Sequence, residues 1–204
     1  MTPEMLPWVI SRATGFTAFA LIAGAMVAGL LVRTRVAVGP LKGAGMVDLH
    51  RHLSFLGLIA IAVHGGALLF DATIDVSPAA LVVPGLIDYR PVATGIGVAV
   101  AELALLVHLS FRFRSRIGVR TWRRLHWGTY AVFLGGAAHG ILSGTDTGAL
   151  PAQMLYGGAV AAVAALTGWR AVTARRAATA KAVAGRHTAR VDEPRTRDLE
   201  RAAA

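Results

Sequence analysis

Residues 50–64 read "HRHLSFLGLIAIAVH", and this short stretch decides the fold. It opens with His50 and His52, closes with His64, and is mostly apolar between them. It lies inside the apolar run 46–70, which is longer than the about 20 residues needed to cross a bilayer. Ionisable side chains are costly inside a membrane and are by default functional. We therefore interpret the stretch as a membrane helix with imidazoles at both ends of its span.

Four further apolar runs are long enough to cross a membrane: 8–32, 90–111, 124–145 and 149–170. The whole chain is 55% hydrophobic, and its mean hydropathy is +0.57. Backbone groups in lipid must be hydrogen-bonded within their own segment, which favours helices. The sequence thus predicts an all-α polytopic membrane bundle of five transmembrane helices over residues 8–170. Residues 171–204 form a polar, basic tail that we expect to be partly helical or disordered.

The positive charges indicate the orientation of the bundle. Of the 21 Lys and Arg residues, 19 lie in 33–51, 112–124 and 170–201. The connections 71–89 and 146–148 carry only acidic charges: Asp71, Asp75, Asp88 and Asp146. The positive-inside rule then predicts an external N-terminus and a cytoplasmic C-terminus. The net charge of +10 is explained by topology and by anionic lipid, and nucleic acid is not an expected partner.

Several classes of protein are excluded or disfavoured. The sequence has no cysteine, which excludes disulfides and thiolate metal sites. It contains neither a GxGxxG motif after a strand nor a P-loop, so we expect no flavin or NAD(P)H domain in this chain. The abundance of Ala, Arg and Gly is typical of high-GC bacteria. The expected location is a bacterial plasma membrane, with several passes.

Four histidines match in depth on two helices. His50 and His64 are 14 residues apart, and His126 and His139 are 13 apart, which corresponds to rises of about 21 and 20 Å. The predicted topology makes runs 46–70 and 124–145 parallel, so His50 faces His126 and His64 faces His139. Facing imidazoles in a helix bundle are the axial ligands that six-coordinate haem iron needs. The spacing predicts two haems stacked along the membrane normal.

The helical register leaves one difficulty. A spacing of 14 returns to within about 40° of the same face, but a spacing of 13 leaves His126 and His139 about 140° apart. We expect local unwinding, such as a π-bulge at Gly135 and Gly136, to correct this. His52 is the competing inner ligand. It lies about 120° from His64, so His50 is favoured.

The sequence resembles the ferric reductase-like transmembrane domain family, the haem-carrying core of ferric reductases, NADPH oxidases and the membrane subunit of a methionine sulfoxide reductase. Three stretches carry the resemblance: "ISRATGFTAFAL" (10–21), "DLHRHLSFLGLIAIAVH" (48–64) and "WRRLHWGTYAVFLGGAAH" (122–139). The resemblance implies two b-type haems with bis-His ligation and electron flow from the cytoplasm outward. It also implies a cytoplasmic flavoprotein or quinol as donor and an extracytoplasmic electron acceptor. The chain departs from the family in having five predicted helices rather than six and no attached flavin domain.

Charged residues near the histidines are candidate partners for the propionate groups of the haems. Haem propionates need cationic partners, and Arg12 lies at about the depth of the outer pair, while Arg51, Arg123 and Arg124 lie near the inner pair. Glu102 is deep in the run 90–111, where a buried carboxylate is costly unless it is protonated or paired. Two roles are open for it: uptake of a proton coupled to haem reduction, or, as we favour, a neutral carboxyl group hydrogen-bonded to a neighbour.

Two functions remain open at this point. The first is a di-haem cytochrome b that serves as the electron-transfer subunit of an oxidoreductase. The second is a non-redox membrane protein, either a small transporter or a scaffold, whose histidines join helices or pass a metal. A divalent-metal path favours carboxylates beside the imidazoles, and Glu102 alone offers one in mid-membrane.

Overall fold

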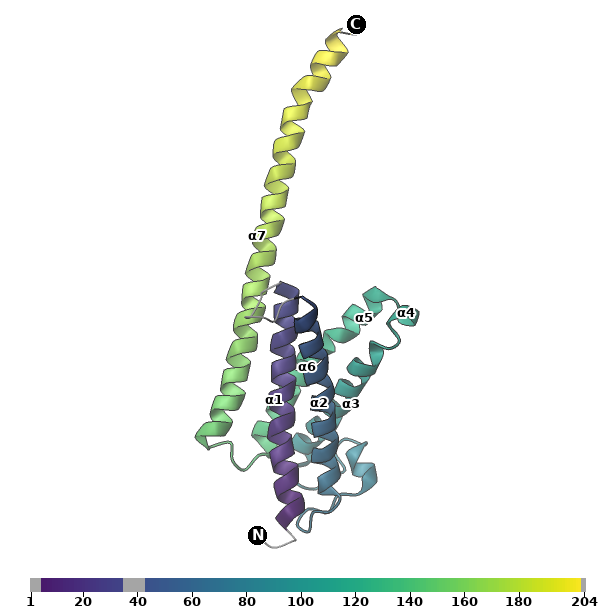
Figure 1. Ribbon diagram of the computed structural model, residues 1–204, viewed down its shortest axis with the longest axis vertical. Coiled ribbons are helices and arrows are strands. Elements are labelled where there is room, and N and C mark those ends of the chain that lie inside the picture. Colours follow the sequence, from purple (N-terminus) through teal and green to yellow (C-terminus); the bar gives the residue numbers. More distant parts are fainter. Residues whose placement is uncertain (1–4, 35–42, 203–204) are drawn as a thin grey trace. The chain divides into compact units, whose positions relative to one another are not determined.

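A computed structural model describes residues 5–34 and 43–202 of the chain, and the described part is helical and contains no strand. The elements are α1 (Leu6–Thr34), α2 (Ala44–Leu68), the 3₁₀ helix η2 (Pro78–Leu81), α3 (Pro91–Ser110), α4 (Arg114–Ile117), α5 (Val119–His126), α6 (Gly128–Ser143) and α7 (Leu150–Ala202) (Figure 1). The predicted all-helical class is confirmed. The chain divides into two compact units, Met1–Val163 and Ala164–Ala204. We call the first unit the bundle; the second contains the rest of α7.

Four described helices are long and apolar enough to cross a membrane: Leu6–Thr34, Ala44–Leu68, Pro91–Ser110 and Leu150–Thr179. The chain is therefore a multi-pass membrane protein. The predicted run 124–145 is divided at Trp127 between α5 and α6. With 16 residues, α6 rises only about 24 Å, less than the about 30 Å of the hydrocarbon core. The prediction of five crossings is thus not confirmed.

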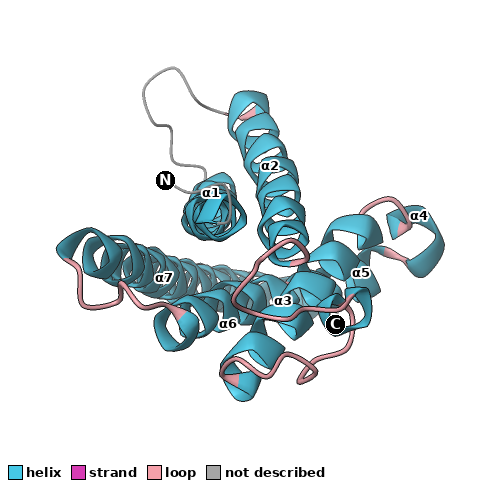
Figure 2. Ribbon diagram, turned by 90° about the horizontal axis from the view of Figure 1, so that it is seen from below, coloured by secondary structure: helices cyan, strands magenta, loops and turns pink. Residues whose placement is uncertain are grey.

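Helices α1 and α2 run antiparallel (Figure 1) and form the most extensive helix–helix contact of the described bundle; Figure 2 shows them as neighbours, with α1 seen end-on. Small residues allow this close approach, as is usual between membrane helices. Gly24 of α1 lies against Leu53, and Gly57 of α2 lies against Ile22. The buried residues of α1 include four alanines: Ala18, Ala23, Ala25 and Ala28.

Helices α3 and α6 form a second antiparallel pair. Gly128 and Gly135 of α6 lie against Val107 and Val100 of α3. The segment before α3 binds the end of α6, because the Tyr89 hydroxyl donates to the carbonyl oxygen of Ser143 at 3.1 Å. Arg90 likewise donates to the carbonyl of Leu142 at 2.6 Å. These bonds satisfy carbonyls in the last turn of α6 that lack helical partners.

An aromatic cluster joins the two helix pairs. Phe19 of α1 stacks on Phe133 of α6 with a centroid distance of 5.7 Å, and Tyr156 of α7 lies 4.7 Å from Phe19. Phe133 is 1% exposed. In sequence, Phe133 lies between His126 and His139, so the cluster fills the bundle between the levels of the two predicted sites.

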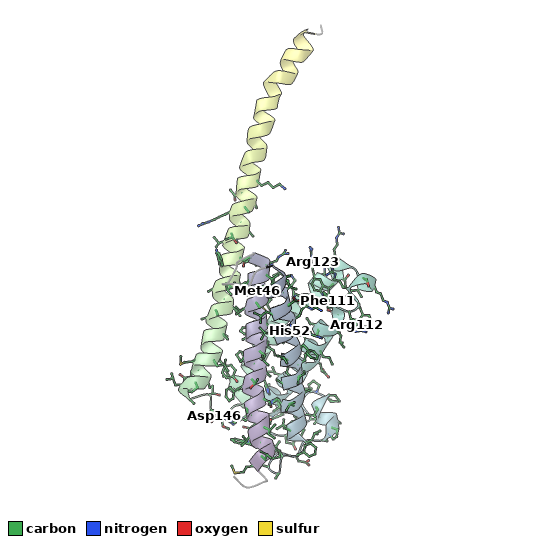
Figure 3. The ribbon with its side chains drawn as sticks, in the orientation of Figure 1. Met46, His52, Phe111, Arg112, Arg123 and Asp146 are labelled. Carbon is green, nitrogen blue, oxygen red and sulfur yellow. The ribbon has the colours of Figure 1, made fainter. Side chains whose placement is uncertain are left out.

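The charges divide between the two ends of the bundle. We call the end where α1 finishes, α2 begins and α4 and α5 lie the arginine end (Figure 1). Arg112 and Arg123 lie there, and Asp146 lies at the opposite end, which we call the aspartate end (Figure 3). Two basic residues of the range 33–51, Arg35 and Lys42, lie outside the described residues.

Candidate functional site

At the arginine end, the structure brings His50 of α2 and His126 of α5 together. Their ring centroids are 6.1 Å apart, and their planes cross at 74°. The Nδ1 of His50 lies 2.8 Å from the carbonyl oxygen of Ala25 in α1. We call His50 and His126 the inner pair.

The outer pair, His64 of α2 and His139 of α6, has nearly the same geometry. The centroids are 6.0 Å apart and the planes cross at 75°. The Nδ1 of His64 lies 2.7 Å from the carbonyl of Ser11, and the Nδ1 of His139 lies 2.8 Å from the carbonyl of Ala93. The rings thus meet in the pairs expected from the spacing, and their role as ligands stays a prediction.

The hydrogen bonds of three of these rings fix which nitrogen is free. A backbone carbonyl only accepts, so the Nδ1 atoms of His50, His64 and His139 carry the hydrogen. In a neutral imidazole the Nε2 atom is then left with its lone pair. Metal-ligating histidines characteristically donate the other ring N–H to a carbonyl or carboxylate. Each of these rings is therefore prepared to ligate through Nε2.

The distance between the ring centres within each pair also fits one metal ion bound between the two rings. An imidazole nitrogen lies about 2 Å from a bound transition metal, and a ring centre lies about 1.1 Å beyond that nitrogen, so two rings on opposite sides of one metal have centres roughly 6.2 Å apart. The observed separations of 6.1 and 6.0 Å agree with this value. Two imidazoles alone make a poor site for a bare cation, whereas a porphyrin supplies the other four nitrogens. Both pairs therefore fit bis-His haem.

Three of the histidines pack against glycines of the neighbouring helix. A Cβ atom built on Gly29 would lie 3.2 Å from the His50 ring, and one built on Gly15 would lie 3.0 Å from His64. At Gly97 the Cβ would lie only 2.5 Å from His139. A side chain at Gly97 would therefore force the His139 ring to shift, whereas one at Gly15 or Gly29 would make a tight contact that the ring must relieve by a small movement.

The apolar run that carries His126 and His139 is interrupted, although not where the sequence suggested. Residues 128–143 form a regular α-helix, so the predicted π-bulge at Gly135 and Gly136 is wrong. The break is at Trp127, whose N–H donates to the carbonyl of Arg124, while Trp127 accepts from the N–H of Tyr130. Such bonds over three residues wind the chain by about 120° per residue, so three steps reduce the offset of about 140° to about 80°. As separate helices, α5 and α6 need not share one register.

His126 has a different environment from the other three rings. Its ring stacks on Trp122 of α5, with centroids 5.0 Å apart and planes 28° apart. The Nε1 of Trp122 is buried and has no hydrogen-bond partner among the described residues. A buried donor without a partner is unfavourable, and an anionic group such as a propionate would satisfy it.

Arg12 lies in α1 near the aspartate end, where it forms an ion pair with Asp146 of the α6–α7 connection. Its guanidinium also lies 4.9 Å from the ring centre of Trp8. The side chain is 19% exposed. Its positive charge is therefore shared with a carboxylate, and a role toward a propionate stays a proposal.

The remaining candidates lie outside the two pairs. His52 is exposed, and its Nδ1 donates to the carbonyl of Asp48 within its own helix. Arg51 is exposed and lies 3.7 Å from Asp48. Glu102 was expected to be buried and hydrogen-bonded. This expectation is wrong: the side chain is exposed, on a stripe of α3 shared with Ala99 and Leu106, and no described residue bonds to it.

The glycines and the carbonyl acceptors beside the histidines were not predicted from the sequence. One signal was available, because Gly15 and Gly29 are 14 residues apart, the same spacing as His50 and His64 on the antiparallel neighbour. Gly97, Ser11 and Trp122 gave no such signal.

A family model described as ferric reductase like transmembrane component matches residues 14–137, more than half of the chain. The match includes His50, His64 and His126 and ends just before His139. No curated protein and no solved structure matches the chain.

Proposed function

Since the chain belongs to the ferric reductase-like transmembrane family, we propose that it is a di-haem cytochrome b that carries electrons across a bacterial plasma membrane. The two facing histidine pairs carry this proposal. His50 and His126 would hold the inner haem, and His64 and His139 the outer haem. Iron held in this way supplies one-electron chemistry between the ferric and ferrous states.

The protein's own residues would hold and separate the two sites. The carbonyls of Ala25, Ser11 and Ala93 orient three of the rings and raise the basicity of their Nε2 atoms. The levels of the sites differ by about 20 Å along the helices. Phe19 and Phe133 stack between these levels, where they exclude water and keep the surroundings apolar.

The histidine pairs would restrict the chemistry. If both histidines of a pair hold the cofactor, they leave no place on it for a substrate, so the acceptor would take its electron at the aspartate end without binding to the metal. The arginine end would face the cytoplasm, because basic residues collect on that side of membrane proteins. The electrons would enter there from a flavoprotein or a quinol. The chain would then be one subunit of an oxidoreductase.

The alternative, a transporter or scaffold with metal-passing histidines, has less support. In the described part of the chain, no group of three His, Asp or Glu side chains gathers as a metal site. Glu102 is exposed on α3 rather than buried inside the bundle, and no described residue bonds to it. A metal path through the bundle would place such a carboxylate beside an imidazole.

A vesicle experiment tests transmembrane transfer. The purified full chain is reconstituted into sealed vesicles that contain ferricyanide, and reduced methyl viologen is generated outside. We expect ferricyanide to bleach in vesicles with the wild-type chain, and to bleach no faster than in protein-free vesicles with His64→Ala. Equal bleaching by both chains, beyond the protein-free rate, would contradict the proposal.

A further inference from the structure

The arginine end carries an unusual concentration of free positive charge. Six arginines, which we call the arginine platform, lie on or beside α4 and α5 and are all exposed: Arg112, Arg114, Arg116, Arg120, Arg123 and Arg124. The surrounding sequence, 103–145, contains no Asp or Glu. None of the six forms an ion pair with a described residue. Their charges are therefore available to an external anionic surface.

The platform is physically connected to the inner histidine pair. The guanidinium of Arg114 lies 5.5 Å from the ring centre of Trp122. Trp122 in turn stacks on His126 at 5.0 Å, and His126 faces His50 at 6.1 Å. This series of contacts leads from the charged surface to the predicted inner iron. Binding of anionic lipid alone gives no reason for such a connection.

The histidine and the docking arginines of α5 lie on opposite faces of the helix. Trp122 and His126 are four residues apart and share the inward face of the helix. Arg120 and Arg124 lie about 160° from Trp122, at about 100° per residue, and project from the opposite face. One short helix therefore presents a ligand on one side and a docking charge on the other.

We propose that the arginine platform docks the acidic face of a soluble electron-donor protein, which delivers electrons to the inner site. This inference rests on the proposed function, and it favours a protein over a quinol as donor. Arginine suits the purpose because its planar guanidinium binds carboxylates in bidentate fashion. In the transfer itself the donor loses one electron and the inner iron gains it, and no bond is made or broken.

A binding experiment with a matched control tests the platform. The full chain is placed in phosphatidylcholine nanodiscs, and reduced flavodoxin, a small acidic flavoprotein, is the probe. The variant is Arg112→Gln/Arg116→Gln/Arg120→Gln. The control, Arg175→Gln/Arg176→Gln/Lys181→Gln, removes the same charge from exposed positions of α7. At an ionic strength of about 0.01 M, we expect the platform variant to bind flavodoxin with a Kd at least tenfold higher than that of the wild-type chain. At about 0.15 M the difference should be smaller, because the charges are screened. The control should stay within about twofold of wild type.

The remaining outcomes distinguish a failure of the docking platform from a failure of the proposed haem function. The rate of haem reduction by flavodoxin should fall with the Kd, whereas reduction by methyl viologen should be unchanged in both variants. Equal loss of flavodoxin binding in the two variants, or no loss in either, would overturn the platform. So would an effect confined to nanodiscs with phosphatidylglycerol, which would assign the arginines to lipid headgroups. A chain without haem would instead refute the proposed function, whatever the binding result.

Discussion

Three of the four imidazoles, those of His50, His64 and His139, are held by backbone carbonyls of a neighbouring helix. His126 instead stacks on Trp122 of its own helix. His64 touches Gly15 and donates to Ser11, and His139 touches Gly97 and donates to Ala93. The positions of the histidines were readable from the sequence, because lipid makes an isolated ionisable residue conspicuous. The glycines and carbonyls were not, because they depend on the axial register between helices, which one sequence does not specify.

Removing one outer ligand tests the assignment of the pairs. We expect His64→Ala and His139→Ala each to lose the outer haem and keep the inner one, since the pairs lie at different depths. The measurement is haem per chain by pyridine haemochrome, which should fall from two to one. His52→Ala is the control and should keep both. Loss of both haems in either variant, or of neither, would show that the pairing is wrong.

Gly97→Ala tests the packing of one ring without removing a ligand. Its Cβ would lie 2.5 Å from two atoms of the His139 ring, and overpacking of this kind costs about 1–3 kcal/mol. We expect the outer haem to be partly lost, with a lower thermal midpoint for the remainder. Gly66→Ala is the matched control in α2, because nothing lies within 4 Å of its Cβ. If the two variants behave alike, the ring is not held by this contact.

At the scale of the elements, the interruption at Trp127 is the feature that the sequence analysis misplaced. The adjacent Gly135 and Gly136 suggested an irregularity, but they serve the packing of α6, Gly135 against Val100 and Gly136 near Phe19. The actual break depends on backbone bonds around Trp127, for which no residue type is diagnostic. The resulting change of helical register determines the direction in which His126 projects relative to His139.

An insertion at this break tests its role. One alanine added between Trp127 and Gly128 turns α5 by about 100° relative to α6. We expect it to remove the inner haem and leave the outer one, because α6 and α3 still pack together. One alanine inserted after the exposed Gly148 is the control and should keep both haems. Retention of both haems by the first insertion would mean that α5 adapts freely.

The first turn of the connection from α2 to α3 is hydrogen-bonded by the carboxylate of Asp71. Burial alone would raise the pKa of Asp71, but bonds from the Thr73 hydroxyl and the N–H groups of Thr73 and Ile74 outweigh it, and the net shift is downward. A lowered pKa in the folded state stabilises the folded loop above the ordinary Asp pKa of about 3.9, and this contribution is lost as the pH falls through the folded value.

Hydrogen exchange of residues 71–81 tests this dependence. We expect protection of the wild-type loop to fall as the pH drops below the ordinary Asp pKa of about 3.9, after correction for the intrinsic exchange rate. Asp71→Asn should show a smaller change over the same range, and Asp88→Asn, at an exposed position, should behave as wild type. A wild-type loop whose protection is independent of pH would contradict the assignment.

For the whole molecule, hydropathy was sufficient to predict the class, because lipid leaves a backbone few alternatives to the helix. The number of crossings was less predictable. The hydropathy of residues 124–145 does not reveal that this stretch is divided between two helices, α5 and α6. The separation of charge between the arginine and aspartate ends follows from the loops in which those residues occur, and it was readable from the sequence alone.

The central claim is that two pairs of histidines each hold one haem iron between imidazoles that cross at nearly right angles. Perpendicular axial rings donate to different iron d orbitals, which leaves those orbitals nearly degenerate and gives a highly anisotropic low-spin spectrum. The most direct test is low-temperature electron paramagnetic resonance of the oxidised, purified chain, with the spins counted per chain. We expect two such low-spin centres, consistent with ring planes at 74° and 75°. A high-spin signal, or no haem signal from a chain expressed with ample haem, would contradict the account.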